Sequence, residues 1–143
     1  MKSHKNNDSI YVKMEKGEEI IDSLQKIIKK YDINSGWING IGLINKVRIG
    51  SYDVTTKSYD EIDFDDTYEL TSFIGNITKK DGKPFIHAHI SMSDHLCKAF
   101  GGHLFYATIG AAGEFIIKVT DNIINRKFDD DTGLHLWSFE HCE

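Results

Sequence analysis

Three histidines lie close together in the middle of the sequence, and their spacing could bind a metal ion. His87 and His89 are two residues apart in a segment that alternates with apolar residues, and His103 follows Gly101 and Gly102. Both segments predict β-strands. Side chains at i and i+2 of a strand point to the same face, so His87 and His89 stand side by side. If the two strands pair, His103 brings a third ring, and three neutral imidazoles are a common ligand set for zinc or a similar divalent ion.

A reading without a metal stays open, because two histidines on an exposed strand face can simply be solvated. The glycine pair favours a shared pocket, since paired glycines in a strand mark a bulge or a close approach of backbone or ligand. We therefore take Gly101 and Gly102 as ligand-pocket candidates beside the three metal candidates. The remaining histidines lie outside the pattern and are expected to be solvated; they are His4, His95, His135 and His141.

Length and composition indicate one globular domain. The chain has 143 residues, 40% hydrophobic and 11% aromatic, which predicts a single domain over 1–143 with a core at about 10–137. No apolar run approaches the roughly 18 residues that span a bilayer, and the charged N-terminus lacks the apolar segment of a secretory signal. Cys97 and Cys142 form neither a Cys-x-x-Cys motif nor a disulfide framework. We expect a soluble cytoplasmic protein that does not bind membranes.

The charge distribution argues against direct DNA binding. The formal net charge is −5, and the segment 53–69 holds seven acidic residues against the single base Lys57. Proteins that bind DNA by themselves present a basic face and use arginine for base contacts, whereas the only arginines here are Arg48 and Arg126. Frequent Ile, Lys, Asn and Asp with so few arginines is typical of an AT-rich bacterial genome.

The hydrophobic pattern predicts one principal helix and a series of strands. Apolar residues recur at helical spacing over 18–31, with acidic residues at the front and basic residues at the back, as the helix dipole favours. Alternating or apolar runs predict strands, with Gly40 and Gly42 marking a bulge or bend; the ranges are 10–14, 37–44, 46–54, 68–78, 84–92, 101–110 and 114–120. The last two form a hairpin around 111–113, and 126–143 could add a final strand. The class is α+β: a mostly antiparallel sheet with one helix packed on a face.

Three segments in this order resemble a known family. They are Glu69-Leu-Thr-Ser-Phe-Ile-Gly-Asn-Ile77, His87-Ala-His89 and Gly101-Gly-His-Leu104. Together they are similar to the plants-and-prokaryotes-conserved domain, the PPC domain, which plants couple to AT-hook DNA-binding motifs. The resemblance covers about residues 10–137. It implies a compact α+β subunit that assembles as a homotrimer, a prokaryotic branch loosely labelled as DNA-binding, and a metal-like cluster at the histidine positions of prokaryotic members.

The chain departs from the plant pattern at two places. Plant members contact DNA through an Arg-Gly-Arg-Pro hook, which is absent here; the only proline is Pro84. They also carry Gly-Arg-Phe-Glu-Ile in a segment tied to partner binding, where this chain has Thr67 in place of the arginine. Neither plant-type DNA binding nor plant-type partner recognition carries over.

Three functions from different classes remain. The first is a homotrimeric binding or regulatory module that holds a metal, with zinc as the leading candidate, and a small ligand or another protein. The second is a DNA-associated regulator, which the family label supports and the charge opposes. The third is a hydrolytic enzyme in which the metal activates water and Glu69 or Glu114 serves as general base. Structural roles are favoured for both, hydrogen bonding for Glu69 and an exposed hairpin position for Glu114, so they are kept only as ligand-pocket candidates.

Overall fold

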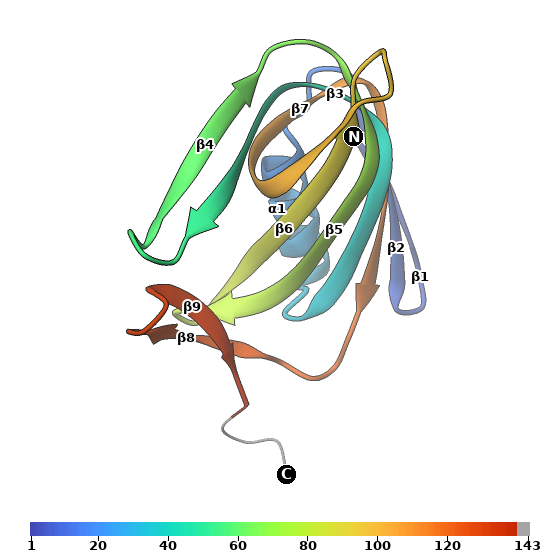
Figure 1. Cartoon of the computed structure of the whole chain (residues 1–143). Coiled ribbons are helices and arrows are strands. Elements are labelled where there is room, and N and C mark those ends of the chain that lie inside the picture. Colours follow the sequence, from blue (N-terminus) through green and yellow to red (C-terminus); the bar gives the residue numbers. More distant parts are fainter. Residues whose placement is uncertain (140–143) are drawn as a thin grey trace.

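The structure, a computed structural model, describes residues 1–139, so His141 and Cys142 lie outside the described residues. Nine strands and one helix follow each other along this part of the chain (Figure 1). They are β1 (Lys2–Asn6), β2 (Ser9–Glu15), α1 (Ile20–Tyr31), β3 (Gly36–Asp53), β4 (Ser58–Phe64), β5 (Tyr68–Lys80), β6 (Lys83–Ser93), β7 (Ala99–Val119), β8 (Asn125–Asp129) and β9 (Leu134–Ser138). The predicted class, α+β with one helix on a mostly antiparallel sheet, is confirmed.

Four strands pair in a closed cycle. β3 pairs with β5, β5 with β6, β6 with β7, and β7 again with β3, all antiparallel. β2 extends this sheet from the second half of β7, and β1 adds to β2. The one parallel pairing joins β5 to β8 at Lys79 and Asn125. The cycle has an inner face, which holds the core, and an outer face, which carries the histidines.

The helix begins and ends where its sequence provides caps. The side chain of Glu19 accepts hydrogen bonds from two backbone N–H groups of the first turn, and Asp32 at the other end adopts a left-handed conformation with φ 51°. Such caps satisfy backbone groups that the helix itself leaves unpaired. The helix therefore starts at Ile20, two residues after the predicted start, because Glu18 precedes the cap.

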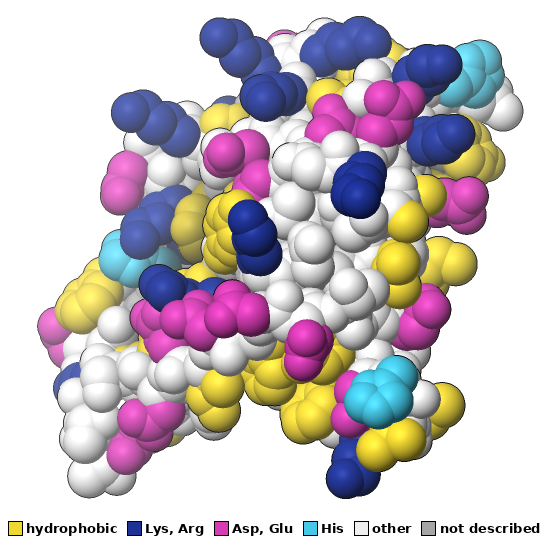
Figure 2. Space-filling model, turned by 90° about the horizontal axis from the view of Figure 1, so that it is seen from above, with side chains coloured by type: hydrophobic (Ala, Val, Ile, Leu, Met, Phe, Trp, Pro, Cys, Tyr) yellow, Lys and Arg dark blue, Asp and Glu magenta, His cyan; other side chains and the backbone are white. Residues whose placement is uncertain are grey.

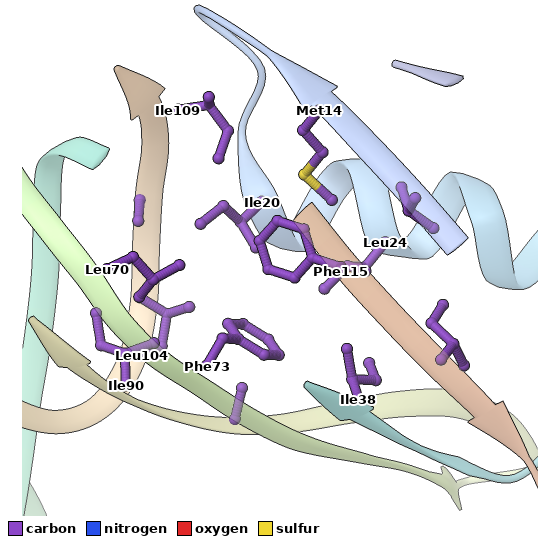
Figure 3. Packing of buried hydrophobic residues seen from close by; sticks show 14 of the residues in the cluster. Met14, Ile20, Leu24, Ile38, Leu70, Phe73, Ile90, Leu104, Ile109 and Phe115 are labelled. Atoms are coloured by element: carbon purple, nitrogen blue, oxygen red, sulfur yellow. The ribbon is translucent and has the colours of Figure 1, made fainter. Parts of the chain in front are cut away.

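The core lies between α1 and the inner face of the strands (Figure 3). Ile20 and Leu24 of the helix face Met14, Ile38 and two aromatic rings from opposite sides of the cycle. These rings, Phe73 of β5 and Phe115 of β7, pack edge to face with centroids 5.4 Å apart. Aromatic pairs of this geometry stabilise the fold by more than the burial of their apolar area alone.

Two hairpins extend beyond the cycle and approach each other. The tip of β3–β4 contacts the turn of β8–β9: the Tyr52 hydroxyl donates to the carbonyl of Thr132 at 2.7 Å, and the Lys57 ammonium donates to the carbonyl of Asp130. In Figure 1 both hairpins lie on the side away from β1 and β2. They frame the part of the outer face where β6 begins.

The structure corrects two predicted strand boundaries. The predicted strands 37–44 and 46–54 form one strand, β3, because Lys46 adopts a positive φ of 49° within a register shift and so bends the strand instead of ending it. The predicted hairpin around 111–113 is wrong. Ala112 and Gly113 pair with β2 and Gly113 also pairs with β3, so β7 runs on without a turn.

Two further strands were not expected from the sequence. β1 lies in the polar N-terminus, and β4 lies inside the acidic segment 53–69, between the predicted strands 46–54 and 68–78. Both strands are polar and largely exposed, so their sequences lack the alternation that signals a half-buried strand. The predicted strands 84–92 and 101–110 correspond to β6, which ends at Ser93, and to the first part of β7, which begins at Ala99. Arg126–Ser138 forms the β8–β9 hairpin.

Candidate metal centre

The register of β5, β6 and β7 brings the three histidines to one place. His89 stands directly opposite His103 across the β6–β7 pair, and His87 lies two residues away on the same strand. Ala88 between them is buried in the core, at 3% exposed. Directly opposed residues of an antiparallel pair project to the same face, so all three imidazoles lie on the outer face.

The three rings form a compact triangle. Their centroids are 5.1 Å apart for His87 and His89, 5.1 Å for His87 and His103, and 5.3 Å for His89 and His103. Each ring offers a nitrogen such that these three atoms all lie within 4.8 Å of one another. Among residues 1–139 this is the one group of histidine, cysteine or carboxylate side chains with that geometry.

The distance between two of the nitrogens fits a tetrahedral metal. Nε2 of His87 and Nε2 of His89 are 3.3 Å apart. Two nitrogens bound to zinc at roughly 2.0–2.1 Å with a tetrahedral angle would be separated by about 3.3–3.4 Å. The third ring carries an unpaired nitrogen. Nδ1 of His103 is buried and has no hydrogen-bond partner among the described residues. Orphaned buried nitrogens are unusual in folded proteins, so the residues present fit a bound cation.

Burial keeps these imidazoles in the form that a metal needs. Burial lowers the pKa of His87 to about 4, and the positive charge of Arg126 and the neighbouring rings lower it further. Burial also lowers the pKa of His103 to about 4, with a smaller contribution from His89. Both rings are therefore neutral at pH 7 and have lone pairs available, as metal binding requires.

Two glycines let β7 pack closely against its neighbours β3 and β6. A side chain on Gly102 would place its Cβ 2.8 Å from the carbonyl oxygen of Gly50 on β3, and one on Gly101 would lie 2.9 Å from that of Ile90 on β6. Both distances are shorter than a carbon–oxygen contact allows, so this backbone position requires glycine. The predicted close approach at the glycine pair is therefore backbone against backbone, and it sets His103 opposite His89.

Aromatic side chains wall the cluster on the side of β4. The ring of Tyr59 packs on His103 with centroids 4.9 Å apart, and Phe105 packs on His103 at the same centroid distance. Burial raises the pKa of the Tyr59 hydroxyl. Gly50 makes room for this stack, since a Cβ there would meet the Phe105 ring at 2.8 Å.

A cation lies near the cluster as well, held by side chains of β5 and β6. Arg126 of β8 lies over the ring of Phe85 at 5.3 Å and donates to the Thr78 hydroxyl at 2.8 Å and to Oδ1 of Asn76 at 2.9 Å. Asn76 is the cross-strand neighbour of His87, so Arg126 is held beside the cluster. Sequence reasoning missed this residue as part of the site. The signal available was its rarity, since it is one of only two arginines in the chain.

The two glutamates proposed from the sequence do not join the histidines. Glu69 is exposed and pairs with Ser93, at the far end of β6 from His87. Glu114 lies eleven residues beyond His103 on β7, opposite Lys13 of β2. Neither belongs to the metal-binding geometry, and Glu114 instead lines a separate groove of about 690 Å³.

That groove lies on what we call the outer apolar face, which is formed by exposed hydrophobic side chains of β2, β3, β5 and β7. Its residues are Tyr11, Trp37, Ile41, Ile74 and Ile116, each between 43% and 55% exposed. The register places Tyr11 opposite Ile116, and Ile74 opposite His89. Asn39 of β3 stands between Ile116 and Ile74, and through Ile74 the outer apolar face adjoins the histidine cluster.

Comparisons with known proteins agree with this fold. Residues 1–121 match the model of the Plants and Prokaryotes Conserved (PCC) domain, which is the PPC domain of the sequence analysis. The chain belongs to this family, as the motifs around His87 and His103 predicted. A search of curated proteins found no match.

Several solved structures are similar over nearly their whole length. A candidate DNA-binding protein from Bacteroides thetaiotaomicron is 31% identical with a TM-score of 0.94, covering 97% of this chain and 97% of that one. A plant- and prokaryote-conserved protein from Pyrococcus horikoshii is 34% identical with a TM-score of 0.84, covering 96% and 93%. A metal-containing protein from Archaeoglobus fulgidus is 29% identical with a TM-score of 0.83, covering 96% and 95%.

Proposed function

We propose that this protein is a homotrimeric binding or regulatory module that holds one divalent transition metal, zinc foremost, on His87, His89 and His103. The observation that carries the metal is the 3.3 Å separation of Nε2 of His87 and Nε2 of His89, beside a third ring whose buried Nδ1 lacks a partner. A similar chain from Archaeoglobus fulgidus is described as metal-containing. Three protein ligands leave a coordination position open for a small ligand.

The outer apolar face supports the trimer. Its five large hydrophobic side chains are each close to half exposed. They lie on one side of the neighbouring strands β2, β7, β3 and β5, with Asn39 of β3 between Ile116 and Ile74. Exposed apolar side chains gathered on one face are typical of protein–protein contacts. Because Ile74 stands beside His89, a subunit packed on this face would lie next to the metal site.

A hydrolytic reaction is not proposed. It would require a general base within hydrogen-bond reach of the metal-bound water, and Glu69 and Glu114 lie elsewhere in the described fold. A DNA-associated role is favoured by the descriptions of similar proteins from Bacteroides thetaiotaomicron and Ralstonia eutropha. On the face seen in Figure 2, lysine and arginine side chains are interspersed with acidic and apolar ones instead of forming one continuous basic stripe.

Metal analysis of the purified protein tests the proposal. We expect wild-type protein prepared without chelator and supplied with zinc to hold one equivalent per chain. His103→Ala should lose most of it, because two imidazoles cannot hold the ion as three do. His95→Ala is the matched control, since His95 is exposed between β6 and β7 and should leave the metal content unchanged. Wild-type protein without stoichiometric metal, or His103→Ala with as much as wild type, would overturn the proposed metal site.

A further inference from the structure

The β8–β9 hairpin carries a cation to the histidine cluster without bringing a carboxylate to neutralise it. Arg126 is half-buried, and burial lowers the pKa of its guanidinium, although an arginine remains charged in proteins. Its hydrogen-bond partners among residues 1–139 are all neutral: Thr78, Asn76 and the carbonyl of His135. No carboxylate within residues 1–139 forms an ion pair with it.

The contrast with the other arginine shows that this is particular to the site. Arg48 on β3 is bonded through two nitrogens to the carboxylate of Asp63, at 2.7 and 3.0 Å, and lies near Glu61. Its charge is compensated at the surface. Arg126 is more buried than Arg48, and removing a charge from water without a counter-charge is costly. Within residues 1–139 this positive charge therefore has no counter-charge, and it could attract an anion.

The guanidinium is fixed in place but keeps hydrogen-bonding capacity. Three of its nitrogens each donate one hydrogen bond to the neutral partners, and a guanidinium has about five N–H donors in a planar fork. Roughly two donors thus remain for a ligand. The Phe85 ring, 5.3 Å from the guanidinium carbon, and the buried Thr78 limit its movement.

The cluster and the arginine share one face of the sheet. Phe85, His87 and His89 alternate along β6, and Asn76, which accepts from Arg126, stands opposite His87. The Arg126 charge is also among the causes of the low His87 pKa. A divalent ion on three neutral imidazoles would add two further positive charges within the same half-buried space, and like charges at short range repel strongly.

We propose that the histidine cluster and Arg126 together bind a small oxyanion of the carboxylate or phosphate type. One oxygen of the anion occupies the open position on the metal, and the remaining charge faces the guanidinium fork, which matches such groups geometrically. This inference rests on the proposed metal site and adds the chemical class of its ligand. Arg126 lies beyond residues 1–121, the part that matches the family model.

Cobalt(II) in place of zinc makes the binding visible, because its absorption spectrum changes when a ligand enters the coordination shell. Acetate and inorganic phosphate are titrated separately, and imidazole serves as a neutral ligand for the same open position. We expect wild-type protein to bind at least one of the two anions at the metal. Arg126→Gln should lower the affinity for that anion roughly ten- to hundredfold, the effect of losing a charge-assisted hydrogen bond. The same substitution should change the affinity for imidazole less than about twofold.

Three controls separate the anion site from other effects of the substitution. Arg48→Gln removes the same charge from β3 and should leave all three ligands unchanged. Cobalt affinity should stay the same or rise in Arg126→Gln, because a repelling charge is removed, whereas a disrupted hairpin would lower it. Arg126→Lys keeps the charge but not the fork, so its anion affinity should lie between wild type and Arg126→Gln, and this variant decides the question if Arg126→Gln loses cobalt.

The outcomes distinguish the two proposals. Wild-type protein that fails to bind cobalt overturns the metal site and the anion site together. If cobalt binds but neither acetate nor phosphate changes its spectrum, or if Arg126→Gln and Arg126→Lys bind the anions as wild type does, the anion site is overturned while the metal site stands.

Discussion

Two neighbouring regions of the outer face follow the same strand alternation but differ in what they lack. The histidine cluster is a half-buried set of imidazoles with an unpaired nitrogen and an unneutralised cation beside it. The outer apolar face is an exposed set of hydrophobic side chains without covering residues among those described. Under the proposals made above, the component that would complete each region differs: a metal with an anion in the first region, and an apolar protein surface in the second.

The difference arises from what covers each region within the chain. The β3–β4 and β8–β9 hairpins reach the histidine cluster: Tyr59 packs on His103, and Arg126 bonds to Asn76, the cross-strand neighbour of His87. Neither hairpin reaches Ile116 or Tyr11 on β7 and β2, where the sheet continues instead into β1. A region enclosed by its own chain becomes a small-ligand site, whereas an open apolar region suits a second subunit.

The largest expected effect comes from placing a charge on the outer apolar face. Ile116→Lys should convert an assembly of about three times the 16.3 kDa chain mass into monomers, because burying an unpaired ammonium in an apolar contact is unfavourable. Light scattering at micromolar concentration measures the mass. Ile62→Lys on β4, also exposed, is the control and should keep the wild-type mass. A stable wild-type monomer would remove the assigned role of this face.

A smaller effect is expected from the glycine that positions His103. Gly102→Ala should lower the free energy of unfolding by about 1–3 kcal/mol and weaken metal binding, since the new methyl group meets the Gly50 carbonyl. Denaturant unfolding and metal content provide the readouts. Gly110→Ala is the matched control on the same strand, because its nearest atoms lie 3.5 Å away, an ordinary contact. Equal stabilities for the two variants would contradict the close approach.

The pH dependence of the metal-free protein tests the burial of the cluster. His87 and His103 have pKa values of about 4 when folded, below the value of about 6.5 for an unperturbed histidine. Between these values the unfolded chain binds more protons, so the free energy of unfolding should fall as pH drops from about 6.5 to 4 and should not depend on these groups above 6.5. Chelator-treated wild type and His87→Gln/His103→Gln are compared by thermal melts. An identical pH profile for both would show that the rings are not buried.

The smallest expected effect is that of duplex DNA. Neither region supplies a basic surface, and the net charge of −5 with two arginines offers little counterion release. Fluorescence anisotropy at about 0.15 M salt should detect no sequence-specific complex of submicromolar affinity, with or without zinc. Such a complex would contradict the prediction and would mean that the protein has a DNA-binding surface besides these two regions.

How far the sequence could predict this protein depended on how local each signal was. His87 and His89 were assignable to one face because strand alternation is a property of adjacent residues. His103 could be joined to them only on the condition that its strand paired with theirs, and the register of β6 and β7 meets that condition. The hairpin predicted around 111–113 failed because small residues and a glycine suggest a turn locally, while pairing with β2 and β3 keeps the strand extended.

By itself, the sequence determined the class of fold, the family, the helix and the identity of the three histidines, because periodicity and short motifs are encoded in neighbouring residues. Only the tertiary structure decided that the rings meet, that burial keeps His87 and His103 neutral, and that Glu69 and Glu114 stand apart from them. It also decided the place of Arg126, which is 39 residues from His87 in the chain. Arg126 bonds to Asn76, and Asn76 is the cross-strand neighbour of His87. Contacts between distant segments depend on strand register and hairpin packing, and no local pattern specifies those.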